Sequence, residues 1–457
     1  MTAFLFATLT ILGIFIPEAA LAMLYVGMAA WALLPDFGEG YRLPLTFVWV
    51  IGCYLLHGTT SNRRKRGIVS VPVERKLALF TLVAAISLLW SANRPYGQWK
   101  LLLFGGMAAG MTWFLGLWYQ HRLGMIKKLP IAFGIASLAP LAVLVDVSWR
   151  LRGFAGLLPW NIFVERRLQF EEVYSVFGAS DALLTAGLCC VYQASISKKA
   201  ARLLWALLIL SDVWGLLLLG QRAQFVIFVL AVPLIGLGWR RGGTKAPSAA
   251  VLLGRMVVVL SLCGILVNVQ LSYNVRSSYE FMADDSSLSN RVLAAQTALE
   301  AFIDNPVMGV GLGNFATYFQ LRSTEFVNVA TDGAFGSKLN SKVRRVFPHN
   351  IFLEVLAEMG IIGFALWASF CSAVVRLCRS ALRQSRVFDL HALAWLSIAW
   401  IVARLLVCAT SGDLAMLNFG PPLAVLIAIH KRATLDRQDR IPVLYLHPRG
   451  ARRAGIA

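Results

Sequence analysis

Long apolar runs, separated by short polar and basic segments, make up most of the chain. Each run is 15 to 25 residues long, and an α-helix of about 20 apolar residues spans the hydrocarbon of a bilayer. The pattern therefore predicts an all-α, polytopic membrane protein with about 12 transmembrane helices. The first two runs are separated only by Pro17 and Glu18, so they form either a hairpin or one broken element, and the total is 12 or 13. The runs are Thr2–Ile16, Ala19–Leu34, Leu43–His57, Leu77–Ser91, Leu101–Tyr119, Leu129–Val147, Val176–Ser195, Leu203–Gly220, Phe225–Trp239, Met256–Leu271, Ile351–Val375, Leu390–Cys408 and Leu414–His430.

The composition supports the same class. Of 457 residues, 58% are hydrophobic and only 14% are charged, whereas a soluble domain is about half apolar and a quarter charged. A surplus of this size exceeds what one globular core can bury. The first run lacks a basic start and a small-residue cleavage site, so we expect a retained span. The seven cysteines lie inside or at the edge of apolar runs without a CxxC pair, which indicates neither a disulfide framework nor a metal site.

The net charge of +20 could suggest nucleic acid, but the positions of the basic residues argue against it. They cluster in short loops between apolar runs, as the positive-inside rule describes, rather than on one amphipathic face. If the segment 62–66 is cytoplasmic, strict alternation places five further basic regions in the cytoplasm. These six regions hold 27 of the 43 Lys and Arg residues. We therefore expect a membrane protein with a cytoplasmic C-terminus.

The same alternation divides the chain into four parts. Residues 1–271 form N-terminal transmembrane helices, 272–348 a large periplasmic loop, 349–430 C-terminal transmembrane helices, and 431–457 a basic cytoplasmic tail. A structureless loop of about 77 residues would be unusual. Within it, Ser289 and Asn290 precede an apolar-periodic run that ends at Asp304, which predicts a capped amphipathic helix near the membrane interface. The role of the second outer loop, 148–175, stays open.

Three polar residues on the expected outer face are candidates for chemistry. Arg222 lies in a tight turn between two spans, where it either snorkels to the headgroups or faces an anionic substrate. Arg291 lies near the start of the amphipathic helix and is either a surface residue or an anion ligand. His349 is the only histidine of the six expected outside, and it is either structural or a general base.

Two other motifs predict no site. The turn Gly309–Gly313 matches neither a dinucleotide fingerprint nor a Walker A motif, and an outer loop meets no nucleotide. The adjacent acids Asp284 and Asp285 lack a DxD or EF-hand pattern, so a solvated loop is the better interpretation. We therefore expect no metal and no cofactor.

Three segments together resemble a known family. They are Asn290–Gln296 (NRVLAAQ), Asp304–Phe315 (DNPVMGVGLGNF) and Pro348–Gly363 (PHNIFLEVLAEMGIIG). An arginine, a PxxGxG turn and an HN-x9-GxxG motif in this order resemble the outer-loop signature of O-antigen ligases and O-antigen polymerases. The resemblance covers about 75 residues, and the rest of the chain is similar only in architecture. It implies the fold of the C-type glycosyltransferases.

The family's functional residues match Arg222, Arg291 and His349. The resemblance implies that both arginines bind the diphosphate of the donor and that His349 deprotonates the acceptor. Glu354, just inside the following helix, is expected to orient His349 and to contribute to substrate binding. Phe364 follows the GxxG motif where ligases tend to carry a small hydroxyl residue, so a polymerase is equally open.

The resemblance implies a glycosyltransferase that acts on the periplasmic face. Its donor would be an undecaprenyl diphosphate-linked glycan and its acceptor a glycan or the lipid A-core, without metal and with inversion. The lipid bilayer and other polysaccharide-assembly proteins are further expected partners, and nucleic acid is not. A transporter or flippase of lipid-linked glycans is the alternative, because Asp181, Asp212 and Arg404 lie within apolar runs. A structural subunit of a polysaccharide-export complex is a third interpretation.

Overall fold

The computed structural model describes residues 15–25, 48, 50–57, 71–153, 176–219, 222–240, 286–323, 347–385, 390–410, 414 and 419–440. Every regular element in these ranges is a helix, which confirms the predicted all-α class. The elements are α2 (Pro17–Tyr25), α4 (Pro72–Ser87), α5 (Arg94–Leu102), the π-helix η2 (Leu103–Gly110), α6 (Met111–Tyr119), α7 (Leu123–Ile126), α8 (Leu129–Ala136), α9 (Leu138–Arg152), α11 (Val176–Ile196), α12 (Lys199–Leu218), α13 (Arg222–Arg240), α15 (Ser286–Asp304), α16 (Phe315–Ser323), α18 (Ile351–Ser385), α19 (His391–Thr410) and α20 (Gly420–Arg440).

Several of these helices are suited to a membrane. Five described stretches are long and apolar enough to cross one: Arg94–Tyr119, Leu123–Arg150, Lys199–Leu218, Ile351–Ser385 and His391–Thr410. The chain is therefore a multi-pass membrane protein. The number of about 12 spans stays a prediction. Most of the predicted span Thr2–Ile16 and all of the predicted span Met256–Leu271 lie outside the described residues. The same holds for the basic segment 62–66, most of the loop 148–175, Asp284 and Asp285, and the tail after residue 440.

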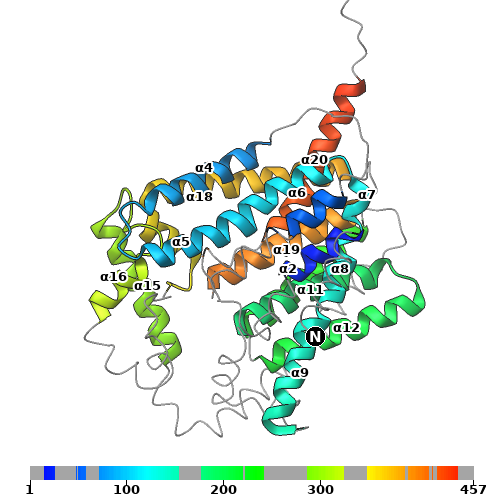
Figure 1. The fold of residues 1–457 in the computed structure, drawn as a ribbon, viewed down its shortest axis with the longest axis horizontal. Coiled ribbons are helices and arrows are strands. Elements are labelled where there is room, and N and C mark those ends of the chain that lie inside the picture. Colours follow the sequence, from blue (N-terminus) through cyan, green and yellow to red (C-terminus); the bar gives the residue numbers. More distant parts are fainter. Residues whose placement is uncertain are drawn as a thin grey trace, which may run out of the picture.

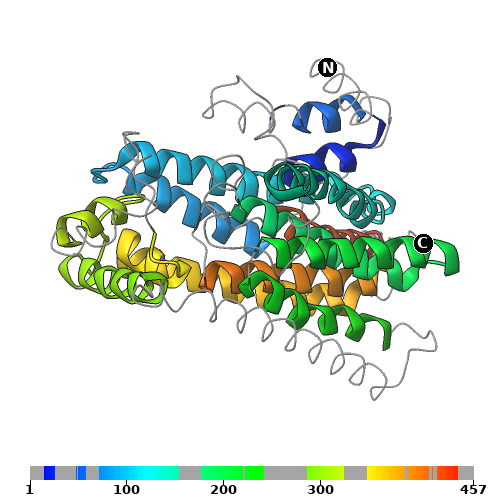
Figure 2. The ribbon, with the colours of Figure 1, turned by 90° about the horizontal axis from the view of Figure 1, so that it is seen from below.

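The helices α4, α18 and the continuous rod of α5, η2 and α6 lie side by side along the molecule (Figure 1). The loop helices α15 and α16 gather at one end of this layer, and α15 packs on the first turns of α18 (Figures 1 and 2). Of the long outer loop, the structure describes α15, the turn that follows it, α16 and the last two residues. The predicted amphipathic helix is confirmed: it ends at Asp304 and begins at Ser286, slightly before the expected cap. Its place at the membrane interface stays a prediction.

Aromatic packing fixes α18 against its neighbours. The Phe80 ring on α4 lies 5.2 Å from Trp367 on α18 and 5.4 Å from Phe104 on η2. The Phe370 ring on α18 stacks on Phe419 at the start of α20, with centroids 5.6 Å apart. All five side chains are buried. Pairs of this kind contribute about 0.5–1.5 kcal/mol each beyond their buried area, so the middle of α18, after Gly360, is held in a defined place.

The charged residues within the apolar bundle are mostly paired. Arg404 of α19 is 1% exposed and its Nη1 lies 2.7 Å from Asp181 Oδ1 of α11. Asp212 of α12 is also buried, beside the Ser137 hydroxyl and the Cys190 thiol. The Asp181–Arg404 pair joins the helices α11 and α19, which is a structural use of charge within an apolar bundle. Such a pair needs no transport pathway to explain it.

Candidate functional site

The glycine-rich turn between α15 and α16 docks on the start of α18 through its backbone. Residues 306–311 lie along residues 357–362, so that two segments about 50 residues apart in sequence form a short ladder of main-chain hydrogen bonds. We call this contact the glycine clasp. Its bonds run from Val310 N to Ala357 O (2.9 Å), from Gly311 N to Glu358 O (2.8 Å), from Ile361 N to Pro306 O (2.9 Å) and from Ile362 N to Val307 O (3.4 Å).

The clasp requires glycine on both sides. Gly309 has φ 67° and Gly360, within α18, has φ 61°, a left-handed conformation that most side chains disfavour. A Cβ at Gly309 would lie 2.4 Å from the backbone carbon of Glu358, and one at Gly360 would lie 2.4 Å from the Val307 oxygen. Gly360 also breaks the regular geometry of α18, which exposes the backbone groups that the turn uses. The PxxGxG and GxxG motifs are therefore two halves of one contact.

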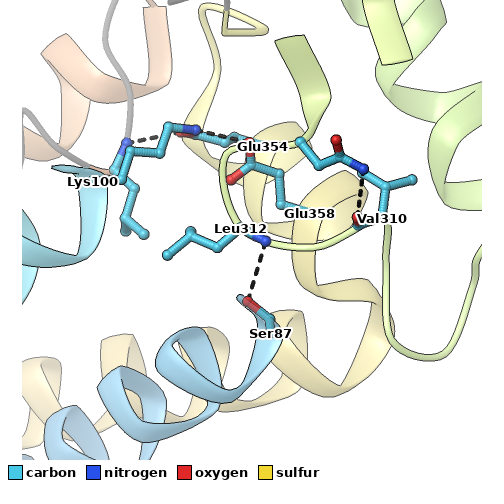
Figure 3. Close-up of polar contacts among 8 residues, drawn as sticks. Ser87, Lys100, Val310, Leu312, Glu354 and Glu358 are labelled. Carbon is cyan, nitrogen blue, oxygen red and sulfur yellow. Dashed lines mark hydrogen bonds and ion pairs between the residues drawn. The ribbon is translucent and has the colours of Figure 1, made fainter. Parts of the chain in front are cut away.

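The other side of the same turn contacts the connection from α4 to α5. The Leu312 amide donates a hydrogen bond to Ser87 Oγ at the end of α4 (3.2 Å), as Figure 3 shows. Gly97 of α5 packs so closely that a Cβ there would lie 2.3 Å from the Leu312 oxygen. The turn thus lies between the N-terminal helices and α18, and it ties α15 to both.

A buried cluster of charges lies beside the clasp. Lys100 of α5 contacts the Oε1 atoms of both Glu354 and Glu358, the latter at 2.8 Å. The three side chains are 0–1% exposed, and Figure 3 shows both carboxylates turned toward the lysine. The second oxygen of Glu354 accepts a hydrogen bond from the Leu414 amide (2.8 Å). The ammonium group also lies 4.9 Å from the centre of the Tyr96 ring.

This cluster depends on its lysine. By formal charge it holds one cation and two anions, and Glu358 Oε2 has no hydrogen-bond partner among the described residues. Burying ionised groups costs several kcal/mol for each ion unless partners compensate. Lys100 therefore neutralises two carboxylates that one turn of α18 brings together, and it joins α5, α18 and the segment before α20.

Arg291 lies in the second turn of α15 and is exposed. Its Nη1 donates to the carbonyl of Thr410, the last residue of α19, at 3.4 Å. A cation near the C-terminal end of a helix is favoured by the helix dipole. Within the part of the chain that the structure describes, this contact is the hydrogen bond that holds Arg291, and no ion pair to an acid is present. Most of its donors remain available because the guanidinium has five N–H groups.

His349 precedes α18 in a left-handed conformation, with φ 56°. Histidine is among the residues that adopt this region more often than most. The next residue, Asn350, caps the helix: its Oδ1 accepts hydrogen bonds from the amides of Phe352 (2.9 Å) and Leu353 (3.3 Å). The imidazole is half-buried and packs against Phe347, with ring centroids 4.6 Å apart. In the His-Asn motif, the asparagine thus caps the start of the helix and the histidine lies in the turn that precedes it.

The structure places two of the three predicted catalytic residues on elements that touch. Arg291 is on α15 and His349 directly precedes α18, on which α15 packs. Arg222 begins α13, and its side chain lies outside the described part of the chain, so its approach to the other two stays a prediction. Glu354 is buried in the lysine cluster rather than open to solvent. Its predicted contact with substrate stays a prediction.

Sequence reasoning missed Lys100 and Glu358. A signal for the pair was present: Glu354 and Glu358 are four residues apart on one helix face, and Lys100 directly precedes an apolar run. No local sequence pattern indicated that the lysine and the two glutamates are in contact. Among the described residues, no group of three or more His, Cys, Asp or Glu side chains could hold a metal ion.

A search of curated proteins finds no match. Residues 204–368 match the family model described as O-antigen ligase. The matched region runs from α12 into α18, so it contains Arg222, Arg291, His349 and Glu354 as well as both halves of the glycine clasp. This match over residues 204–368 supports an assignment to the O-antigen ligase and polymerase family.

Proposed function

We propose that the protein transfers a glycan from undecaprenyl diphosphate to an acceptor hydroxyl on the periplasmic face of the inner membrane. The family implies ligase or polymerase activity in general, and thus a lipid-linked glycan substrate at a membrane. The observation that carries the proposal is the clasped pair of α15 and α18, which presents an exposed arginine and a half-buried histidine from neighbouring elements. The acceptor is a glycan or the lipid A-core.

The reaction is a single displacement. The acceptor oxygen attacks the anomeric carbon as His349 takes its proton, and the bond from that carbon to the diphosphate oxygen breaks. The electron pair leaves with undecaprenyl diphosphate. Arg222 and Arg291 stabilise the charge that develops there, because a guanidinium offers two parallel hydrogen bonds to phosphate oxygens. One displacement inverts the anomeric carbon.

The roles of the remaining residues follow from their surroundings. Glu354 lies one turn into the helix that His349 precedes, and Lys100 and the Leu414 amide hold its carboxylate. We assign it to the position of this helix start, and through it to the orientation of His349. Charge stabilisation by two arginines needs no divalent cation, so the proposed mechanism is metal-independent.

Purified protein in nanodiscs, with lipid-linked donor and acceptor, tests the assignment. His349→Ala removes a general base, which contributes about 10²–10⁴-fold, so turnover falls by this factor while donor affinity stays nearly unchanged. Arg291→Lys keeps the charge but loses the planar fork, and turnover falls by about 10²-fold. The matched control is Arg150→Lys, since Arg150 is an exposed arginine paired with Asp146.

Two results would overturn the mechanism. Near-wild-type turnover of His349→Ala would remove the general base and leave His349 as a residue of the helix entry. Loss of turnover in excess EDTA, with recovery on adding Mg²⁺ or Mn²⁺, would refute metal independence. If the purified protein moved the lipid-linked glycan across the bilayer without forming a transfer product, this result would support the transporter alternative.

A further inference from the structure

The end of α18 farthest from His349 carries three arginines on one face. Arg376, Arg379 and Arg383 are spaced by three and four residues, which aligns them along the helix. All three are exposed. Together with Ser380 and Gln384 they line a pocket of about 330 Å³. All five lining residues belong to α18, so the pocket is a half-open hollow along one face of this helix.

No acid neutralises these arginines within the described residues. Arg376 donates to the neutral hydroxyl of Ser372 (2.8 Å), and neither Arg379 nor Arg383 has an ion pair. On α4 and α20, which pack against α18, the nearby carboxylate of Glu74 is already bound to Lys431 at 2.7 Å. The pocket thus has a positive charge that nothing in the described chain compensates.

The pocket also offers a hydrogen-bond acceptor. The amide oxygen of Gln384 is buried and has no hydrogen-bond partner among the described residues. The Ser380 hydroxyl shares a hydrogen bond with His430 Nδ1 of α20 (2.9 Å), which fixes that wall of the pocket. A ligand that satisfies the lining must therefore combine an anion for the arginines with a hydroxyl donor for Gln384.

The depth of the pocket matches a lipid headgroup. A helix rises about 1.5 Å per residue, so Arg376 lies about 24 Å and Arg383 about 35 Å along α18 from Gly360. The hydrocarbon core of a bilayer is about 30 Å thick. Val375 is an exposed apolar residue and Arg376 follows it directly. The change from lipid-facing to charged side chains thus occurs where the second headgroup layer is expected.

We propose that this pocket binds the phosphate of an anionic phospholipid in the leaflet opposite to the candidate site, and that the ligand is phosphatidylglycerol. The arginines bind the phosphate, and a hydroxyl of the headgroup glycerol donates to Gln384. Basic pockets beside membrane helices are suited to lipid phosphates. The positive-inside rule explains a general excess of basic residues in cytoplasmic loops. It does not explain why these arginines share one helix face, line a pocket and lie beside a buried acceptor.

Native mass spectrometry of the full-length protein in neutral detergent, titrated with defined lipids, tests the proposal. Phosphatidylglycerol should bind at least tenfold more tightly than phosphatidylcholine. Arginines near a membrane surface contribute about 1 kcal/mol each, so Arg379→Gln combined with Arg383→Gln should weaken phosphatidylglycerol binding about thirtyfold. Gln384→Leu should weaken it severalfold and leave phosphatidic acid, which lacks the glycerol headgroup, unaffected. The control is Arg150→Gln combined with Arg202→Gln, two exposed arginines on other helices.

Each outcome decides the proposal. Equal binding of the two lipids by wild type, or unchanged phosphatidylglycerol binding by the double Gln variant, overturns it. Soluble glycerol phosphate that binds as tightly as the lipid shows a site for a free anion and also overturns it. If the double Gln variant does not fold, Arg379→Lys with Arg383→Lys keeps the charge and should lose only part of the affinity. Because transfer activity is not measured, failure here leaves the proposed function untouched.

Discussion

The charged side chains at the two ends of α18 lie in opposite environments. At the end next to His349, Glu354 and Glu358 are buried and joined to Lys100, so that no charge reaches solvent. At the other end, Arg379 and Arg383 are exposed and lack an acidic partner among the described residues. Both groups of charges belong to the same helix, which packs against α4 and α20.

This difference separates two uses of ionised side chains. A buried charge contributes to the fold only through its partner, because removing one member leaves the other desolvated. An exposed charge contributes little to stability and remains available to a ligand. We therefore expect substitutions near His349 to affect stability and activity together, and substitutions near Arg383 to affect neither unless an anionic lipid is present.

The largest effect is expected for Lys100→Met. It leaves two buried carboxylates without a cation, which costs about 3–5 kcal/mol. Adding Glu354→Gln and Glu358→Gln to the variant removes the unpaired charge and should restore most of the lost stability. Thermal unfolding in detergent measures both. Lys199→Met, at an exposed lysine at the start of α12, is the control. A Lys100→Met protein as stable as wild type would contradict the buried cluster.

A smaller effect is expected for Gly309→Ala. The left-handed backbone costs on the order of 1–3 kcal/mol for a residue with a side chain, and the added Cβ collides with Glu358. The glycine-rich turn should detach from α18, and transfer activity should fall while the protein still inserts into the membrane. Limited proteolysis of the outer loop and the transfer assay measure this. Gly124→Ala, where nothing lies within 4 Å of the new Cβ, should change neither. Unaltered protease resistance in Gly309→Ala would refute the clasp.

The smallest effect is expected for Arg383→Gln in neutral detergent, where stability should change by less than about 0.5 kcal/mol. A ligand that binds only the folded state raises the unfolding temperature. Phosphatidylglycerol should therefore raise the unfolding temperature of the wild type, and it should raise that of the variant by less. Unfolding scans with and without the lipid measure the difference. A large loss in detergent alone would mean that Arg383 has a structural partner, and the contrast between the two ends of α18 would disappear.

The sequence predicted features that depend on local pattern. Apolar runs placed the described spans, and the periodicity of Val292, Ala295 and Leu299 predicted α15 up to its end at Asp304. The family signature led to His349 and Arg291. The glycine clasp and the partners of Lys100 were not predictable in this way, because each joins segments that share no local pattern.

Glu354 shows the limit most clearly. A carboxylate five residues after a candidate base suggested a role toward that base or the substrate. The structure shows that this carboxylate also forms a buried ion pair with a residue 254 positions earlier in the chain, while its role toward the base or the substrate stays a prediction. Helical spacing reveals which residues share a helix face, but tertiary packing decides which residues from elsewhere in the chain contact that face.

The separation of Lys100 from Glu354 also sets the order in which the protein is built. At a synthesis rate of about 5–20 residues per second, the lysine is made roughly 10–50 s before the carboxylate that neutralises it. Ser87 likewise precedes Leu312 by 225 residues. During this interval the nascent α4 and α5 carry a cation and a hydroxyl whose native partners do not yet exist. The end of the bundle next to His349 is therefore completed late in biogenesis, only after α18 has been synthesised.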